Sequence, residues 1–221
     1  TAKEVTPLKE SLISESRYTA LREKLETCDD IAQRMQISRK AIEANTQISE
    51  QVKHFQIRPA LKELENVPGA ADVAAKLSID NPSTYHGHLN ELITARDLSR
   101  NGYKILEMDL RVQTAHGKTD IDILAQATDG RVFAIELKRV TDGITNNSLY
   151  FKPKIDKLAD LVNTKIGNHT VTDSVFVNRG KINDNARDYA ISRGIRIIDN
   201  TDAPKIKDLH RVIQNLAISK K

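Results

Sequence analysis

The residues best suited to chemistry are two acids and a lysine on neighbouring segments: Asp122, Glu136 and Lys138. Both segments alternate apolar and polar side chains, which predicts two β-strands, residues 119–125 and 132–140. Residues two apart on a strand share a face, so Glu136 and Lys138 point the same way. If the two strands pair as a hairpin, Asp122 converges with them.

Two carboxylates and an ammonium are sufficient to hydrolyse a phosphodiester. Mg²⁺ takes oxygen ligands and is usually held by one or two carboxylates, waters and a substrate phosphate. Bound metal polarises a phosphoryl oxygen and lowers the pKa of its water, and a nearby lysine adds positive charge where negative charge develops. The plainer interpretation of the E-x-K triplet is a solvent-facing ion pair. Apolar residues on the opposite strand faces favour chemistry, because charges on a deeply buried sheet are costly.

Asp120 is an extra acid on the same strand face as Asp122. It could bind a second metal ion or face solvent at the start of the strand, and we favour the solvent-facing interpretation.

Composition limits the remaining classes of protein. Of the 221 residues 39% are hydrophobic and 29% charged, which indicates a packed core without a membrane-spanning stretch. The single cysteine, Cys28, excludes an internal disulfide and a cysteine-rich zinc site. Aromatic residues make up only 4%, which argues against a base-stacking platform. The chain begins with Thr1, which indicates a processed product or an excised part of something longer.

The apolar spacing divides the chain into a helical region, residues 1–80, and a second domain, residues 81–221. Residues 30–42 resemble a helix-turn-helix, but Gln36 stands where the turn normally has glycine, so one continuous helix is the preferred interpretation. Residues 80–84 are the clearest boundary.

The second domain alternates strands with helices, which predicts an α/β fold with a mixed sheet flanked by helices. Its last part, residues 138–221, is basic, with 16 Lys/Arg against 9 Asp/Glu. That charge suits a polyanionic partner, although on charge alone a solvated mixed-charge surface is the favoured interpretation. The expected helices are 88–101, 154–165, 184–193 and 203–218, and the other expected strands are 103–108, 110–112, 174–178 and 195–199.

The motif D-I-D-I-L-A over residues 120–125, followed by E-L-K over 136–138, resembles the PD-(D/E)XK nuclease superfamily, which has the restriction-endonuclease-like fold. The likeness covers residues 85–200, with the elements in the right order. This stretch is similar to archaeal Holliday-junction resolvases and restriction-type nucleases. A departure is Ile121, where proline is frequent in the superfamily.

The resemblance implies roles for four catalytic residues. Asp122 is the central ligand of Mg²⁺ or Mn²⁺, Glu136 is the second ligand, and Lys138 is the motif lysine. Glu91 fits the acid on the preceding helix that binds or positions metal. The cations Arg139, Lys152 and Lys154 are candidates for contact with nucleic acid, with a solvated helix face as the alternative for the two lysines.

The resemblance also implies a function, a metal-dependent endonuclease acting on nucleic acid in the cytoplasm. DNA is the favoured substrate, and a duplex-cutting enzyme would work as a homodimer. A tRNA-cleaving toxin domain of a bacterial competition protein is close behind; it would be delivered into a target cell and would need an immunity protein. Because the superfamily contains inactive members, the alternative is a binding or assembly module on the same fold.

Overall fold

The computed structural model of the chain describes residues 18–78, 82–140, 143–145 and 149–199. The chain forms two compact units, Thr1–Arg96 and Asp97–Lys221, which are described separately. Among the described residues, no helix combines the length and apolar character needed to cross a bilayer. The helix expected over residues 203–218 lies outside the described part of the chain.

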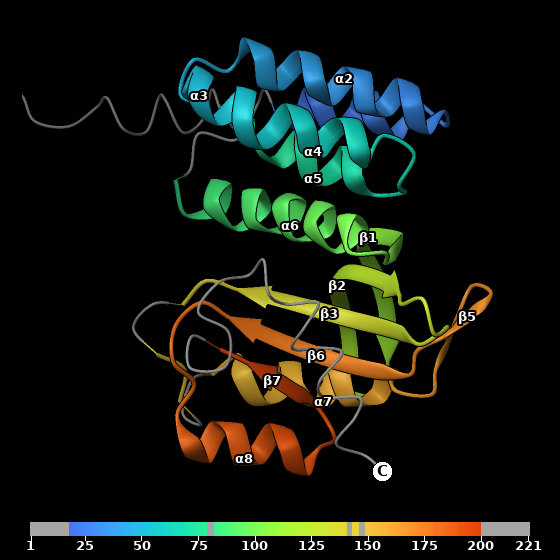
Figure 1. Cartoon of the computed structure of the whole chain (residues 1–221), viewed down its shortest axis with the longest axis vertical. Helices are drawn as coiled ribbons and strands as arrows, with labels where there is room; N and C mark the ends of the chain where they lie inside the picture. The colour runs from blue at the N-terminus through green and yellow to red at the C-terminus, as the bar shows by residue number, and fades with distance from the viewer. Residues whose placement is uncertain (1–17, 79–81, 141–142, 146–148, 200–221) are drawn as a thin grey trace, which may run out of the picture. The chain divides into compact units, whose positions relative to one another are not determined.

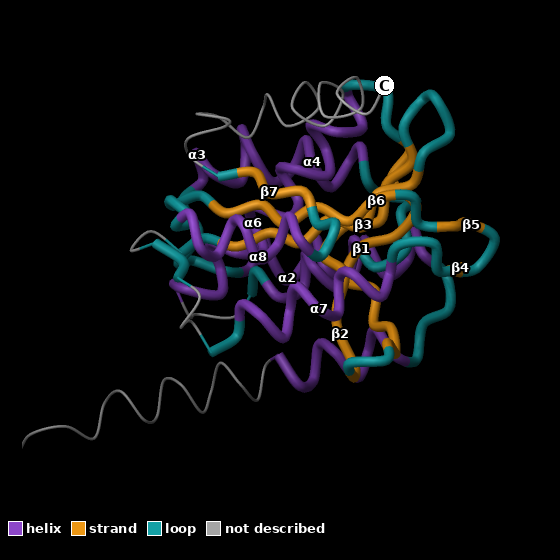
Figure 2. Tube along the Cα trace, turned by 90° about the horizontal axis from the view of Figure 1, so that it is seen from below, coloured by secondary structure: helices purple, strands orange, loops and turns teal. Residues whose placement is uncertain are grey.

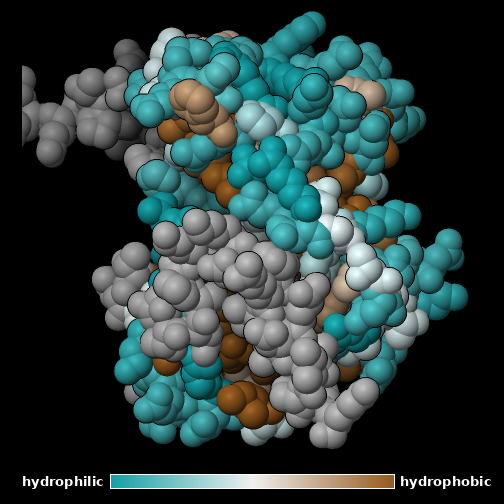
Figure 3. Space-filling view, in the orientation of Figure 1, coloured by the Kyte–Doolittle hydropathy of each residue, from teal (hydrophilic) through white to brown (hydrophobic). Residues whose placement is uncertain are grey.

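The first unit is built from helices, as the apolar spacing predicted (Figure 1). Its Asp30 side chain accepts a hydrogen bond from the backbone N–H of Gln33 and caps helix α2. In the view of Figure 3, the surface over these helices is mostly hydrophilic. Residues 18–26 are helical. The helices that follow are α2 (Ile31–Ala44), α3 (Glu50–Val52), the π-helix η1 (Lys53–Ile57), α4 (Arg58–Glu63), α5 (Ala70–Lys76) and α6 (Pro82–Arg100), whose last turn falls in the second unit.

Helix α2 runs without a break through Gln36. The helix-turn-helix interpretation of residues 30–42 is therefore wrong, and the single continuous helix is correct. Without glycine at the position where a turn needs it, the backbone hydrogen bonds of the helix continue.

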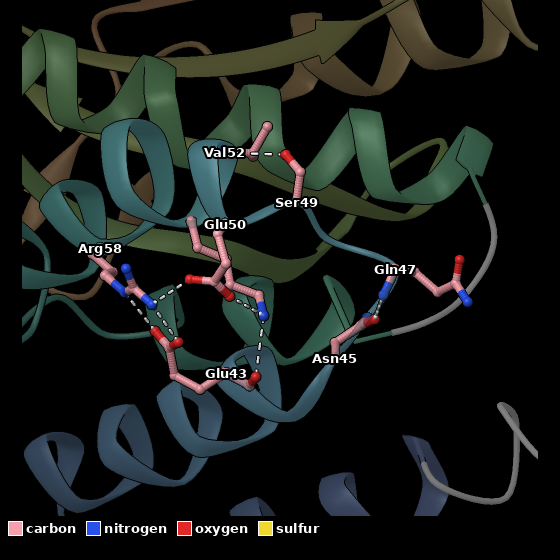
Figure 4. Close-up of polar contacts among 8 residues, drawn as sticks. Glu43, Asn45, Gln47, Ser49, Glu50, Val52 and Arg58 are labelled. Atoms are coloured by element: carbon pink, nitrogen blue, oxygen red, sulfur yellow. Dashed lines mark hydrogen bonds and ion pairs between the residues drawn. The ribbon is translucent and has the colours of Figure 1, made fainter.

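A polar network joins α2 to the helices that follow it (Figure 4). The Arg58 guanidinium donates to both carboxylate oxygens of Glu43, at 2.8 and 2.6 Å, and to Glu50 at 3.0 Å. The buried Lys53 ammonium reaches the Glu43 carbonyl and the Glu50 carboxylate. Pro59 has no N–H to donate, and the π turn just before it accommodates the proline inside an otherwise continuous helix.

The second unit contains a mixed five-stranded sheet in the order β1-β2-β3-β6-β7. The first three strands are antiparallel, and β6 and β7 continue the sheet in parallel with β3. Gly130, at φ 87°, allows the tight turn between β2 and β3. The strands are β1 (Lys104–Thr114), β2 (Gly117–Gln126), β3 (Val132–Lys138), β6 (Asp173–Asn178) and β7 (Arg196–Ile198).

A separate two-stranded hairpin, β4 (Lys165–Ile166) and β5 (His169–Thr170), was not predicted. Two residues per strand are too few to produce a recognisable alternation of apolar and polar side chains.

Helices α7 (Phe151–Leu161) and α8 (Asp184–Ser192) cover one face of this sheet (Figures 1 and 2). Phe151 of α7 stacks edge-on against Phe176 of β6, with ring centroids 5.4 Å apart. Phe176 is paired with Glu136 of β3, and paired residues on adjacent strands point to the same face. The face that carries Glu136 therefore lies under α7.

We predict that the docking of α7 depends on Ile155, whose side chain is fully buried. Ile155→Ala should lower the free energy of unfolding of the second unit by about 2–5 kcal/mol, because it removes buried methyl groups and leaves a cavity. Denaturant titration measures the change. The matched control, Ile191→Ala in α8, alters a side chain that is 58% exposed and should change stability by less than about 0.5 kcal/mol.

Candidate active site

The strands β2 and β3 separate at Asp122, and we call the place where they part, at Asp122 of β2 and Glu136 of β3, the fork. Their pairing extends to Ile123 opposite Ile135, and the next position would place Asp122 opposite Glu136. Instead, the backbone N–H of Leu137 donates to the Asp122 carboxylate at 2.6 Å. In a continued antiparallel ladder, that N–H would bond to a backbone carbonyl of β2. The carboxylate of Asp122 thus replaces a ladder bond and lies against the β3 backbone next to Glu136.

The carboxylate of Glu136 is buried, with 1% of the residue exposed. Its Oε1 lies 2.6 Å from the Lys138 ammonium, and its Oε2 lies 2.7 Å from the Lys154 ammonium. A buried charge is costly unless opposite charges compensate it at close range. The two lysines supply this compensation, one from the same strand and one from α7.

Of the predicted site residues, Glu136 and Lys138 form an ion pair, and the Asp122 carboxylate bonds to the backbone of Leu137, which lies between them in the chain. Lys154, expected only as a nucleic-acid contact, joins them through its ion pair with Glu136. Asp120 lies outside the group. Its side chain is 58% exposed and 3.6 Å from Arg111 of β1, as the solvent-facing interpretation expects.

The other predicted cations lie apart from Glu136 in different ways. Lys152 is on α7, but its ammonium lies 5.2 Å from the ring centroid of Tyr189 in α8. Arg139 is exposed just beyond β3. Burial, and the nearby charge of Arg139, lower the pKa of the Arg179 guanidinium, which places two like charges beyond the ends of β3 and β6.

Tyr150 is a neighbour of the site that was not singled out from the sequence. Burial raises the pKa of its hydroxyl, and the positive charge of Lys138 opposes that rise. The side chain is 43% exposed at the start of α7. Its type and its position before a helix carry no signal of chemistry, because its nearness to Lys138 arises only when α7 packs on the sheet.

Glu91 lies on α6 within the first compact unit. It is 9% exposed, and its Oε1 is 3.2 Å from Nδ1 of His88, one turn earlier. Its role as the helix acid stays a prediction.

The donor set at the fork fits a hard divalent cation. Asp122 and Glu136 supply carboxylates from two neighbouring strands, and Mg²⁺ is commonly held by two carboxylates with waters and substrate phosphate. Within the described ranges, no three His, Cys, Asp or Glu side chains are grouped as metal ligands. A metal at this position would therefore draw on water or substrate oxygens for its remaining ligands.

Comparison with known proteins identifies the class. The family model Mrr_cat, described as restriction endonuclease, matches residues 85–209, more than half of the chain. The chain belongs to this restriction endonuclease family, and the resemblance to the PD-(D/E)XK nuclease superfamily is confirmed. The five-stranded mixed sheet flanked by helices and preceded by a helical region is the restriction-endonuclease-like fold that was expected.

Solved structures with some similarity include three with TM-scores below 0.5. A protein of unknown function, AF1548, has 20% identity and a TM-score of 0.40, over 58% of this chain and 65% of that one. A repair endonuclease from Pyrococcus abyssi has 16% identity and a TM-score of 0.34, over 54% of this chain and 48% of that one. Protein VC1899 from Vibrio cholerae has 12% identity and a TM-score of 0.39, over 96% of this chain and 57% of that one. The chain spans less than two thirds of the length of each. No curated protein matches the chain.

We predict that the Asp122 carboxylate contributes to stability as well as to chemistry. Asp122→Ala should cost about 1–3 kcal/mol of unfolding free energy, because it removes the acceptor of the Leu137 N–H. Asp122→Asn should cost less, because the amide oxygen can still accept. Chemical denaturation of metal-free protein measures both changes.

The control is Asp120→Ala, two residues earlier on the same strand, which should stay within about 0.5 kcal/mol of the original protein because its ion pair is exposed. Equal losses at the two positions would contradict the role assigned to the Asp122 carboxylate.

Proposed function

We propose that the chain is an endonuclease that hydrolyses phosphodiester bonds of DNA with Mg²⁺ or Mn²⁺. The observation that carries the proposal is the fork between β2 and β3, where Asp122 binds the backbone next to Glu136 and two ammoniums flank the Glu136 carboxylate. Membership of a restriction endonuclease family supports DNA as the substrate over tRNA. The nuclease domain in this proposal is residues 81–221.

Each residue has a defined part in the proposed reaction. Asp122 and Glu136 hold the metal, which when bound polarises a phosphoryl oxygen and lowers the pKa of water. Lys138, with 37% of its side chain exposed, presents its ammonium on the same face and stabilises the negative charge that develops on the phosphate. Glu91 is proposed as a further acid that positions the metal.

The phosphate backbone is proposed to run beyond the ends of β3 and β6. Arg139 is exposed there, and an anion would relieve its repulsion of the neighbouring Arg179. Lys152 is a weaker candidate for this contact, because its ammonium already lies over the ring of Tyr189.

We predict cleavage of plasmid DNA that requires Mg²⁺ or Mn²⁺ and stops in EDTA. Glu136→Ala and Lys138→Ala should each lower the cleavage rate roughly 100-fold or more, because the first removes a metal ligand and the second removes charge stabilisation in the reaction. Gel electrophoresis of plasmid products over time measures the rate. The control, Lys165→Ala in the β4–β5 hairpin, should retain the original rate.

The same gels separate the competing possibilities. Nicked circles indicate a single active site, whereas linear product indicates two sites acting together and therefore a homodimer. Loss of total tRNA with intact plasmid would replace the DNA proposal with that of a tRNA-cleaving toxin, whose partner would be an immunity protein. Binding of nucleic acid without cleavage under either metal would support the inactive module instead.

A further inference from the structure

The Lys154 ammonium has an acceptor for each of its three N–H donors. It lies 2.7 Å from Glu136 Oε2, 2.8 Å from the Asp120 carbonyl oxygen and 3.1 Å from Thr119 Oγ1. An ammonium has three donors and no acceptor, so the number of close oxygens equals its number of donors. Its side chain is 16% exposed. A phosphate contact by Lys154 would require one of these partners to be given up.

The three partners of Lys154 come from both sides of the fork. Thr119 and Asp120 precede Asp122 on β2, whereas Glu136 is on β3. Backbone pairing of these strands extends only to Ile123 and Ile135. Across the fork the strands are joined by side chains, and Lys154 is the bridge that α7 supplies. The Lys154 ammonium and the bond from the Leu137 N–H to Asp122 both link the two strands at this point.

The two lysines on Glu136 differ in their surroundings. Lys138, on Oε1, has 37% of its side chain exposed, more than twice the 16% of Lys154 on Oε2. The more exposed ammonium is the more accessible of the two to a bound phosphate. The more buried one is held by α7, whose core residues Phe151 and Ile155 are fully buried.

We infer that Lys154 is a positioning residue, which holds Glu136 at a set distance from the strand bearing Asp122 and does not bind nucleic acid. This inference rests on the proposed function, because positioning the two acids matters only if they act together. It separates the two lysines on Glu136: Lys138 acts on substrate, and Lys154 holds the acid in place.

The test is Lys154→Met, which keeps the length of the side chain and removes the ammonium. We expect kcat for plasmid cleavage at saturating Mg²⁺ to fall roughly 10- to 100-fold, as small misplacements of reacting groups do. KM for the DNA should stay within about threefold of the original value, because no phosphate contact is lost. The matched control is Lys157→Met, one turn further along α7, whose ammonium donates to the Lys118 carbonyl and not to an acid; it should keep both constants.

A binding measurement without metal separates positioning from phosphate contact. In EDTA, the affinity of Lys154→Met for duplex DNA and its dependence on salt should equal those of the original chain. Arg139→Gln, the proposed phosphate contact, should reduce the slope of log K against log salt by about 1. A similar loss of slope in Lys154→Met, with a raised KM and unchanged kcat, would overturn the inference.

Thermal unfolding tests the same contact without any activity. Lys154→Met should lower Tm in the original chain and lower it by less in a Glu136→Gln background, because the lost partner is the Glu136 carboxylate. Additive effects of the two changes would contradict the inference. If the chain cleaves no nucleic acid at all, the proposed function fails, while this coupling still decides whether Lys154 holds Glu136.

Thr119→Val keeps the experiment informative if Lys154→Met does not fold. It removes one of the three acceptors and leaves the ion pair, so kcat should fall by a few-fold with KM unchanged. An unchanged kcat in this variant would count against the bridge across the fork.

Discussion

The carboxylate of Glu136 has to remain charged beneath a helix, and much of the second unit follows from that requirement. A buried anion is tolerated only when cations reach it at hydrogen-bonding distance. One cation comes from two residues along the same strand, and the other comes from α7. Helix α7 must therefore dock in one register on the sheet, and its buried aromatic contact with Phe176 holds it there.

The separation of β2 from β3 makes room for this arrangement. In an unbroken antiparallel ladder, the Leu137 N–H would bond to a backbone carbonyl of β2. Because pairing ends at Ile123, the Asp122 side chain takes the Leu137 N–H, and Lys154 takes the Asp120 carbonyl. The Leu137 N–H and the Asp120 carbonyl are thus bonded to side chains, and the acids of two strands come beside this gap.

Much of the fold could be predicted from local sequence patterns. Alternating side chains located β2 and β3, helical spacing located α7 and α8, and the motif over residues 120–138 indicated the superfamily. The errors and omissions have local causes. Gln36 in α2 could be read as a turn because apolar spacing alone does not distinguish a turn from a continuous helix. The β4–β5 hairpin is too short to show a period.

The candidate site divides in the same way between sequence and structure. Asp122, Glu136 and Lys138 could be named in advance because strand periodicity fixes which side chains share a face. The role of Lys154 could not be named in advance, because it lies 16 positions beyond Lys138 and its partners lie on two strands. The period of a strand or a helix is visible in residues that are neighbours in the chain, so the sequence predicts it. The compensation of a buried charge is decided by which distant groups the packing of a helix on a sheet brings within reach.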